Sequence, residues 1–240
     1  MLEFSAVRCR LGGQPVLQGV DLRVAKGDFH ALAGENGAGK TTLIRILLDL
    51  IRNIDSGTLT IDGLDRRDPR ARERLVYLPE KFDLPPEVSG WQYLRFVSGV
   101  YREALDRDRV AELCVRMSLD VARLDDRTRG YSKGMKQKLG LISCFMLSVP
   151  LIILDEPLSG LDPRARYCFK QLLHAEKAQG RTLFYSTHLL ADAEEICDRF
   201  AILHDGRIIF DGPPEECLRA HGADSLEQAY MRAIGALEAC

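Results

Sequence analysis

The chain has 240 residues, a length that suits one large folding unit or two small ones. Its 33 basic and 35 acidic side chains give a net charge of −2, which provides no overall electrostatic reason to bind nucleic acid. No stretch approaches the roughly 18 apolar residues that span a bilayer, and the first residues lack a secretory signal, so we expect a cytosolic protein that is soluble alone.

Apolar runs of two kinds alternate along the chain. Short runs bounded by turn residues predict strands, and apolar residues spaced by three or four predict helices. Residues 41–50 fit a helix, and residues 91–147 carry three helical patterns, so a helical insertion is expected at about 83–149. The predicted strands are residues 29–33, 58–62, 75–78, 151–154, 182–186 and 200–203.

The order of elements in the second half predicts the type of sheet. Helical segments separate the last three predicted strands, and this alternation implies parallel strands with crossover helices. Residues 204–207 fit a hairpin turn, and a peripheral helical tail is expected from about 213 to 240. The α/β core is therefore expected at about 1–82 and 150–215.

One stretch of the chain is locally basic. Asp68 and Glu73 interrupt it, so an ordinary solvated surface is the expected explanation. Its arginines are Arg66, Arg67, Arg70, Arg72 and Arg74.

A glycine-rich segment joins the predicted strand at 29–33 to the predicted helix. It fits the pattern G-x-x-x-x-G-K-[ST], in which backbone N–H groups converge on phosphates because glycines keep side chains out of the way. Lys40 is expected to reach the β- and γ-phosphates of a nucleotide, and the Thr41 hydroxyl to bind Mg²⁺. The helix N-terminus near Lys40 also favours an anion. The expected nucleotide-binding residues of this segment are Gly34, Glu35, Asn36, Gly37, Ala38, Gly39, Lys40, Thr41 and Thr42.

Two carboxylates end the uniformly apolar strand at 151–154. Such a strand is buried on both faces, and its carboxyl end is where ligands bind in open α/β sheets. Asp155 is predicted to hold Mg²⁺, directly or through water, and Glu156 to orient and polarise the attacking water. His188 follows the strand at 182–186, where a neutral imidazole can hydrogen-bond a γ-phosphate oxygen. These residues indicate that ATP is hydrolysed as well as bound.

With these segments in place, the chain resembles the ATP-binding cassette (ABC) ATPases over roughly residues 2–215. Further elements of that family follow in order: residues 131–135 (Tyr-Ser-Lys-Gly-Met) resemble the signature, residues 159–162 resemble the loop that crosses the dimer interface, and His188 matches the switch histidine. The resemblance implies a P-loop NTPase fold with a mostly parallel sheet, an N-terminal antiparallel β subdomain and an inserted helical subdomain carrying the signature. It also implies two subunits packed head to tail around ATP, with Ser132 and Gly134 of one contacting the γ-phosphate on the other.

Four positions depart from the family pattern. Glu80 stands where the lid loop usually has glutamine; a carboxylate can ligate Mg²⁺ or water but cannot donate a hydrogen bond while ionised. Leu11 stands where an aromatic side chain usually stacks on adenine, so simple apolar contact with the base is expected. Lys133 and Met135 replace a usual glycine and a usual glutamine of the signature. These variants resemble a bacterial exporter subgroup in which a separate membrane protein supplies the pore.

The function implied by the resemblance is an ATP-binding and hydrolysing subunit that powers export through an integral membrane permease, from the cytoplasmic face of the cell membrane. The second ATPase subunit is either an identical copy or a related chain. The alternative is a soluble ABC ATPase acting on nucleic acid or protein assemblies, although no nucleic-acid partner is expected. A phosphotransferase using the same loop would leave residues 131–135 and His188 unexplained.

A helix of the permease is expected to dock between residues 80 and 101. Apolar side chains cluster there, and about half of them are expected to be exposed in the isolated chain. They are Phe82, Leu84, Trp91, Leu94, Phe96, Val97 and Tyr101.

Overall fold

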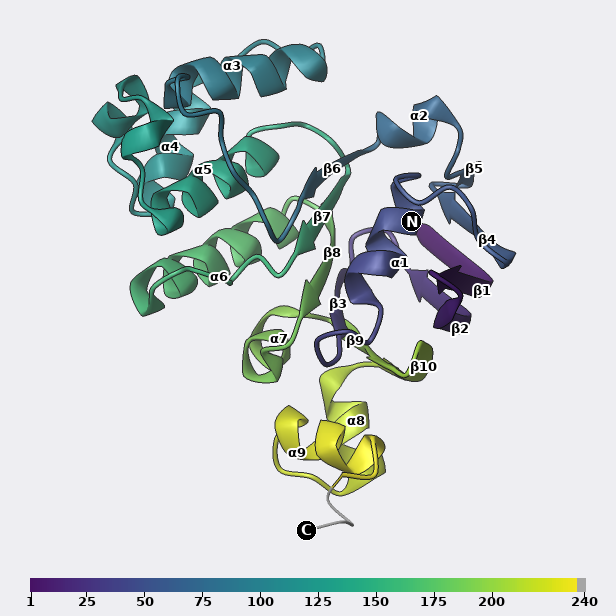
Figure 1. Ribbon diagram of the computed structural model, residues 1–240. Coiled ribbons are helices and arrows are strands. Elements are labelled where there is room, and N and C mark those ends of the chain that lie inside the picture. Colours follow the sequence, from purple (N-terminus) through teal and green to yellow (C-terminus); the bar gives the residue numbers. More distant parts are fainter. Residues whose placement is uncertain (237–240) are drawn as a thin grey trace.

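The computed structural model describes residues 1–236, so the last part of the predicted tail, 237–240, lies outside the described residues. Within that range the central sheet is built from β3 (Phe29–Ala33), β6 (Leu75–Leu78), β7 (Leu151–Asp155), β8 (Thr182–Thr187), β9 (Arg199–His204) and β10 (Arg207–Gly212). The strand order is β10-β9-β3-β8-β7-β6, and every neighbouring pair is parallel except the β9–β10 hairpin (Figure 1). The predicted mostly parallel sheet is confirmed. Strands β3, β7 and β8 are buried throughout, as expected for mostly apolar strands at the centre of a parallel sheet.

A second, antiparallel sheet covers one side of the phosphate-loop helix. It has the order β2-β1-β4-β5, with β1 (Leu2–Leu11), β2 (Gln14–Val24), β4 (Ser56–Ile61) and β5 (Leu64–Asp65). Helix α1 (Lys40–Leu47) packs between this sheet and the central one, in a single apolar cluster that includes Leu43, Phe4 and Phe184 (Figure 1). The antiparallel sheet implied by the family resemblance is thus confirmed.

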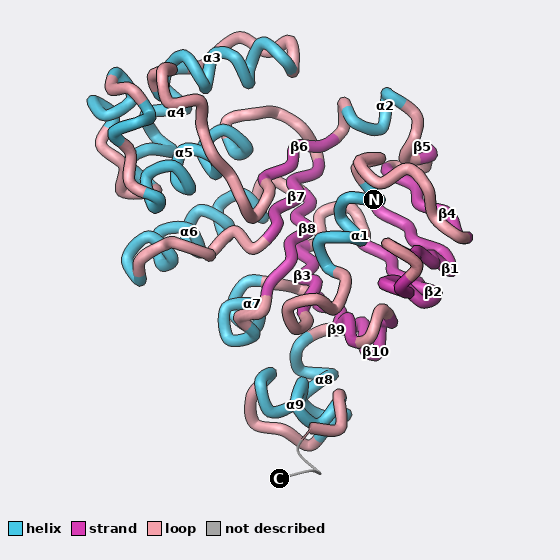
Figure 2. Tube along the Cα trace, viewed as in Figure 1, coloured by secondary structure: helices cyan, strands magenta, loops and turns pink. Residues whose placement is uncertain are grey.

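The segment between β6 and β7 consists of helices and loops (Figure 2). All three predicted helical patterns form helices: α3 (Gly90–Val100), α4 (Arg107–Arg116) and α5 (Lys133–Phe145). In α4 the side chains of Val110, Leu113 and Cys114 are buried, whereas Val115 is 74% exposed.

The remaining helices flank the sheet and form the tail. They are α2 (Pro69–Arg72), α6 (Pro163–Lys177), α7 (Leu190–Ile196), α8 (Pro214–His221) and α9 (Leu226–Ala233). Within the described residues, α8 and α9 are the helices of the segment that follows β10. None of the helices in the described part of the chain is long and apolar enough to cross a membrane.

Arg66 overturns the expectation of a solvated arginine surface. Its side chain is 3% exposed and donates to the carbonyl oxygens of Ile46 (2.9 Å), Ile51 (3.2 Å) and Arg52 (2.8 Å), while it pairs with Asp49 at 3.0 Å. Carbonyls at a helix end lack intrahelical donors, so Arg66 caps the end of α1. The neighbouring Arg67, Arg70, Arg72 and Arg74 are exposed, as expected.

A buried carboxylate ties the helical segment to the sheet. Glu176 of α6 is 1% exposed and accepts from Arg109 of α4 at 2.5 Å and from Arg181 at 3.0 Å. Arg181 also donates to the Phe145 carbonyl at the end of α5, at 3.3 Å. A buried charge is tolerated only with such partners. The contacts of Glu176 and Arg181 therefore fix α4 and α5 relative to the core.

Candidate nucleotide-binding site

The phosphate loop connects β3 to α1, and its geometry requires glycine. Gly37 and Gly39 have φ angles of 91° and 109°, which L-residues with a side chain rarely adopt. At Gly34 an added Cβ would lie 2.4 Å from the Leu203 carbonyl oxygen, so any side chain there would collide with the backbone of β9. The loop can therefore approach a ligand with its main chain uncovered.

Two hollows border this loop and share Glu35, Asn36 and Gly37. The first has a volume of about 320 Å³, and Gly39, Lys40, Thr41, Thr42, Glu80, Lys81 and Glu156 complete its lining. The second has a volume of about 410 Å³ and is completed by Pro15, Val16, Gln18, Ala38, His204, Asp205 and Gly206. The first hollow thus brings together residues of the predicted phosphate loop, lid loop and catalytic carboxylate.

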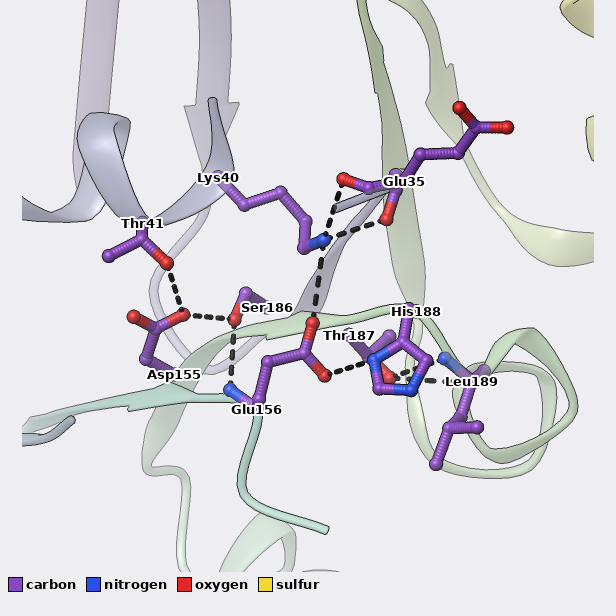
Figure 3. Close-up of polar contacts among 10 residues, drawn as sticks. Glu35, Lys40, Thr41, Asp155, Glu156, Ser186, Thr187, His188 and Leu189 are labelled. Atoms are coloured by element: carbon purple, nitrogen blue, oxygen red, sulfur yellow. Dashed lines mark hydrogen bonds and ion pairs between the residues drawn. The ribbon is translucent and has the colours of Figure 1, made fainter. Parts of the chain in front are cut away.

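Lys40 is the buried lysine that lines the first hollow. It is 6% exposed, and its Nζ donates to the carbonyl oxygens of Gly34 at 2.7 Å and Glu35 at 3.1 Å (Figure 3). The same nitrogen lies 3.4 Å from Oε1 of Glu156. The loop therefore holds the ammonium group in place by its own backbone.

Asp155 ends β7 and is 1% exposed. Its Oδ1 accepts from Thr41 Oγ1 at 3.2 Å and from Ser186 Oγ at 2.5 Å (Figure 3). Ser186 Oγ in turn accepts from the Glu156 N–H at 2.9 Å, so one hydroxyl orients both acidic residues. Burial, reinforced by the charge of Asp155, raises the pKa of Tyr77 to about 12, which keeps that phenol neutral.

The Ser186 side chain was not anticipated as part of the site. Its role depends on strand register: β7 and β8 pair so that Asp155 lies opposite Ser186. The available signal was a serine at the end of an otherwise apolar strand.

Glu156 and His188 form the second polar pair. His188 Nδ1 lies 2.8 Å from Glu156 Oε2, while Glu156 Oε1 is buried and has no hydrogen-bond partner among residues 1–236. Glu156 itself is 8% exposed and has a φ angle of 49°, a left-handed conformation that is strained for a residue with a side chain. This turn lifts the carboxylate out of the strand toward Lys40 and His188 (Figure 3).

The donor set beside Asp155 fits a magnesium ion. Its Oδ2 is buried without a hydrogen-bond partner in the described part of the chain, and the Thr41 hydroxyl is hydrogen-bonded to Oδ1 of the same carboxylate. Mg²⁺ prefers such oxygen ligands and is usually held by one or two carboxylates together with substrate phosphates and water. Residues 1–236 contain no cluster of three or more His, Cys, Asp or Glu side chains that could hold a metal ion.

The predicted nucleotide contacts Leu11, Ser132 and Gly134 line neither of the two hollows. Leu11 ends β1 and is 41% exposed, whereas Pro15 and Val16 supply the apolar lining beside the loop. Ser132 caps α5, with its Oγ accepting from the Met135 N–H at 3.2 Å, and Gly134 follows in the first turn. Pro15 and Val16 carry no sequence signal of their own, because their position depends on how the β1–β2 hairpin meets the β9–β10 turn.

The surface expected to receive a partner helix is less apolar than predicted. Of the seven side chains, Leu84, Trp91 and Leu94 are buried in the core, and only Phe96 is fully exposed, at 68%. Val100, which was not in the predicted set, is 62% exposed and lines a hollow of about 410 Å³. That hollow is completed by Arg72, Glu73, Tyr101 and Arg102.

Replacing Ser186 by alanine tests how the acidic pair is held. The change removes the donor to Asp155 and the acceptor of the Glu156 N–H, and leaving such buried groups unpaired costs about 1–3 kcal/mol each. We expect Ser186→Ala to lower the thermal midpoint and to raise the Mg²⁺ concentration needed for half-maximal ATPase activity. Ser118→Ala, at an exposed serine, is the control; an unchanged Mg²⁺ dependence in Ser186→Ala would contradict the assigned contact.

Comparison with known proteins agrees with this geometry. The profile of the family described as "ABC transporter" matches residues 17–159. An uncharacterised ABC transporter ATP-binding protein of Nostoc sp. is 38% identical over 205 residues, which are 84% of this chain and 61% of that protein. The chain therefore spans about three-fifths of the length of that relative. Nod factor export ATP-binding protein I of Cupriavidus pinatubonensis is 34% identical over 234 residues, covering 95% of this chain and 71% of that protein.

A solved structure gives the same result over the whole chain. The "Structure of ATP binding subunit of ABC transporter" superposes with a TM-score of 0.88 and 33% identity, covering 98% of this chain and 99% of that one. The matched region includes the phosphate loop, the paired carboxylates and the signature-like segment. The chain therefore belongs to the family of ABC transporter ATP-binding proteins.

Proposed function

We propose that this chain binds and hydrolyses ATP as the nucleotide-binding subunit of an exporter. One observation carries the proposal: Lys40, the Thr41–Asp155 pair and the Glu156–His188 pair meet at the carboxyl edge of β3, β7 and β8. Phosphoryl transfer to water needs a cation for the phosphates, oxygen ligands for a metal and a carboxylate for the water. This edge of the sheet holds all three.

Each residue has a distinct task in this proposal. The main-chain N–H groups of residues 34–39 and the ammonium of Lys40 bind the phosphates. Glu156, whose Oε1 has no hydrogen-bond partner within the described range, accepts a hydrogen bond from the attacking water and receives its proton. His188, held by Glu156 Oε2 at 2.8 Å, contacts the γ-phosphate, and Glu80 of the lid loop lines the same hollow as Glu156.

Thr41 and Asp155, with Glu80 as a further ligand, would hold Mg²⁺. The ion, when bound, neutralises charge that develops on the phosphate oxygens. Ser186 keeps the Asp155 carboxylate in the orientation that leaves Oδ2 free for it.

The signature residues act on a second subunit in this proposal. Ser132 and Gly134 begin a helix outside the hollows of their own chain, where a hydroxyl, an N–H and a helix N-terminus can meet an anion. A head-to-tail dimer, of identical or related subunits, places them on the γ-phosphate held by the partner. ATP then closes the dimer and hydrolysis releases it.

Export is the transport direction that we infer, and the Cupriavidus relative's name, a Nod factor export protein, supports it. The pore belongs to a separate membrane-spanning partner, so the chain works at the cytoplasmic face of the membrane. A short helix of that partner docks beside Val100 and Phe96, at the hollow lined by Arg72, Glu73, Tyr101 and Arg102.

A docking experiment tests this conclusion. The chain is co-expressed with a multi-span membrane protein encoded beside its gene and purified from detergent-solubilised membranes. We expect the two to co-purify, and Val100→Glu to lower the recovered complex at least about fivefold, a loss of roughly 1 kcal/mol or more, because a charge is placed in an apolar contact. Val115→Glu, at a valine of α4 that is 74% exposed, is the matched control. Failure of wild-type chains to co-purify, or equal loss in both variants, would contradict the proposal.

Base selectivity depends on the side chains that contact the base, and Leu11, Pro15 and Val16 have no aromatic ring. If only apolar contact from Leu11, Pro15 or Val16 meets the base, little distinguishes adenine from guanine. We expect GTP to compete with ATP within about tenfold, a difference of roughly 1.4 kcal/mol. Competition of unlabelled nucleotides with a fluorescent ATP analogue measures the ratio; a strong preference for ATP would show that another residue reads the base.

A further inference from the structure

The main chain around Glu156 is held by side chains of two other elements. The Glu156 N–H donates to Ser186 Oγ of β8 at 2.9 Å. One residue further along, the Pro157 carbonyl oxygen accepts from Nε2 of Gln137, a residue of α5, at 3.0 Å. The backbone is therefore tied on either side of Glu156, to β8 and to α5.

This part of the chain needs such support because Glu156 adopts a φ angle of 49°. A left-handed residue with a side chain persists only where the surrounding contacts over-determine its conformation. The next residue, Pro157, has no N–H and cannot donate a hydrogen bond that would hold the turn. Within the loop the Ser159 N–H donates to the Glu156 carbonyl at 3.0 Å, whereas Gln137 connects the loop to a separate helix.

Gln137 is a polar side chain at a buried position. It is 5% exposed, and the buried residues that follow it in α5 are mostly apolar. Methionine or leucine would fill this place without burying an amide that has to be paired, so packing alone does not account for a glutamine there. The need of the Pro157 carbonyl for a donor does account for it.

Helix α5 also packs against the lid loop of its own chain. At Gly140 an added Cβ would lie 2.8 Å from Leu78 Cδ1 and 2.9 Å from the ring of Phe82. Leu78 and Phe82 stand two residues before and two residues after Glu80, and α5 accordingly lies beside β6 (Figure 1). The same helix thus contacts the chain next to Glu80 and the chain next to Glu156.

We infer that Gln137 is a positioning residue, which holds the main chain beside Glu156 so that the carboxylate meets the attacking water. The inference rests on the proposed function, because it takes Glu156 as the general base. Ser132 and Gly134 lie at the start of the same helix. The helix that meets the partner's ATP in the proposed dimer therefore also sets the general base of this chain's own site.

Gln137→Met tests this inference, because methionine keeps the length of the side chain but cannot donate to Pro157. We expect kcat at saturating ATP to fall about 10- to 100-fold, the cost of displacing a catalytic group by up to about 1 Å. The Kd for ATP should stay within about twofold, because the phosphate loop is unchanged. Phosphate release and titration with a fluorescent ATP analogue measure the two quantities. Gln171→Met, at an exposed glutamine of α6, is the matched control and should behave as the wild type.

A double-mutant cycle separates positioning from a general structural role. In a Glu156→Gln chain the base is already absent, so adding Gln137→Met should change the single-turnover rate of ATP hydrolysis by less than about twofold. Gln137→Asn, whose amide is one methylene too short to keep the 3.0 Å contact, should give the same pattern and decides the question if the methionine variant does not fold.

A wild-type kcat in Gln137→Met, or in Gln137→Asn where that is the variant that folds, would overturn the inference. So would an equal loss of rate in the Glu156→Gln chain, or a Kd for ATP that rises in step with the loss of kcat, because both patterns describe a structural role. A wild-type chain that releases no phosphate from ATP would instead overturn the proposed function, and this inference with it.

Discussion

Glu156→Gln should bind ATP normally and fail to hydrolyse it. Glutamine keeps the size of the side chain and its contact with His188 but cannot take up a proton, and loss of a general base lowers the rate by about 10²–10⁴-fold. The neutral side chain also removes a negative charge 3.4 Å from Lys40, so ATP affinity should be retained or increased. In the proposed cycle hydrolysis reopens the dimer, so closed dimers should accumulate with ATP.

Phosphate release at saturating ATP and size-exclusion chromatography with and without ATP measure both effects. Glu112→Gln, on the exposed side of α4, is the control for loss of a carboxylate and should behave as the wild type. Turnover by Glu156→Gln at the wild-type rate would show that another group activates the water.

Lys40→Ala should lose nucleotide binding. The ammonium is the buried cation of the phosphate cavity, and loss of a hydrogen bond to a charged group costs about 1.5–3 kcal/mol, so the Kd for ATP should rise about 10- to 150-fold. The substitution also leaves Glu156 as a buried charge without its nearest cation, which should lower the thermal midpoint in the absence of nucleotide.

Equilibrium titration with a fluorescent ATP analogue measures the Kd, and thermal unfolding without nucleotide measures the stability. Lys40→Ala combined with Glu156→Gln should regain thermal stability, since the unpaired charge is gone, but should not regain affinity. Lys26→Ala, at an exposed lysine in the turn before β3, is the control. A Kd that rises less than about threefold in Lys40→Ala would contradict the assigned role of Lys40.

Much of the fold follows from local pattern. Residues 29–33 and 75–78 are short apolar runs between turns, and both form strands with those bounds. Gly34, Gly37 and Gly39 were expected to keep side chains away from phosphate. The structure adds that Gly34 is also required by the Leu203 carbonyl, a contact across 169 residues that no local pattern contains.

The residues that sequence reasoning missed or misplaced depend on long-range geometry. Ser186 joins the site only because β7 and β8 pair with Asp155 opposite it. From its sequence neighbours, Arg66 was predicted to be one of several surface arginines. In the fold it lies at the end of α1, where it donates hydrogen bonds to carbonyl oxygens.

The left-handed backbone conformation of Glu156 sets thermal stability against activity. A residue with a side chain at a φ of 49° costs about 1–2 kcal/mol relative to glycine, which adopts that conformation freely. Substitution by glycine would therefore relax the backbone while removing the carboxylate that faces Lys40. Stabilising the chain and keeping it active are opposing demands at this one position, so engineering for thermal tolerance should leave residue 156 untouched and look elsewhere.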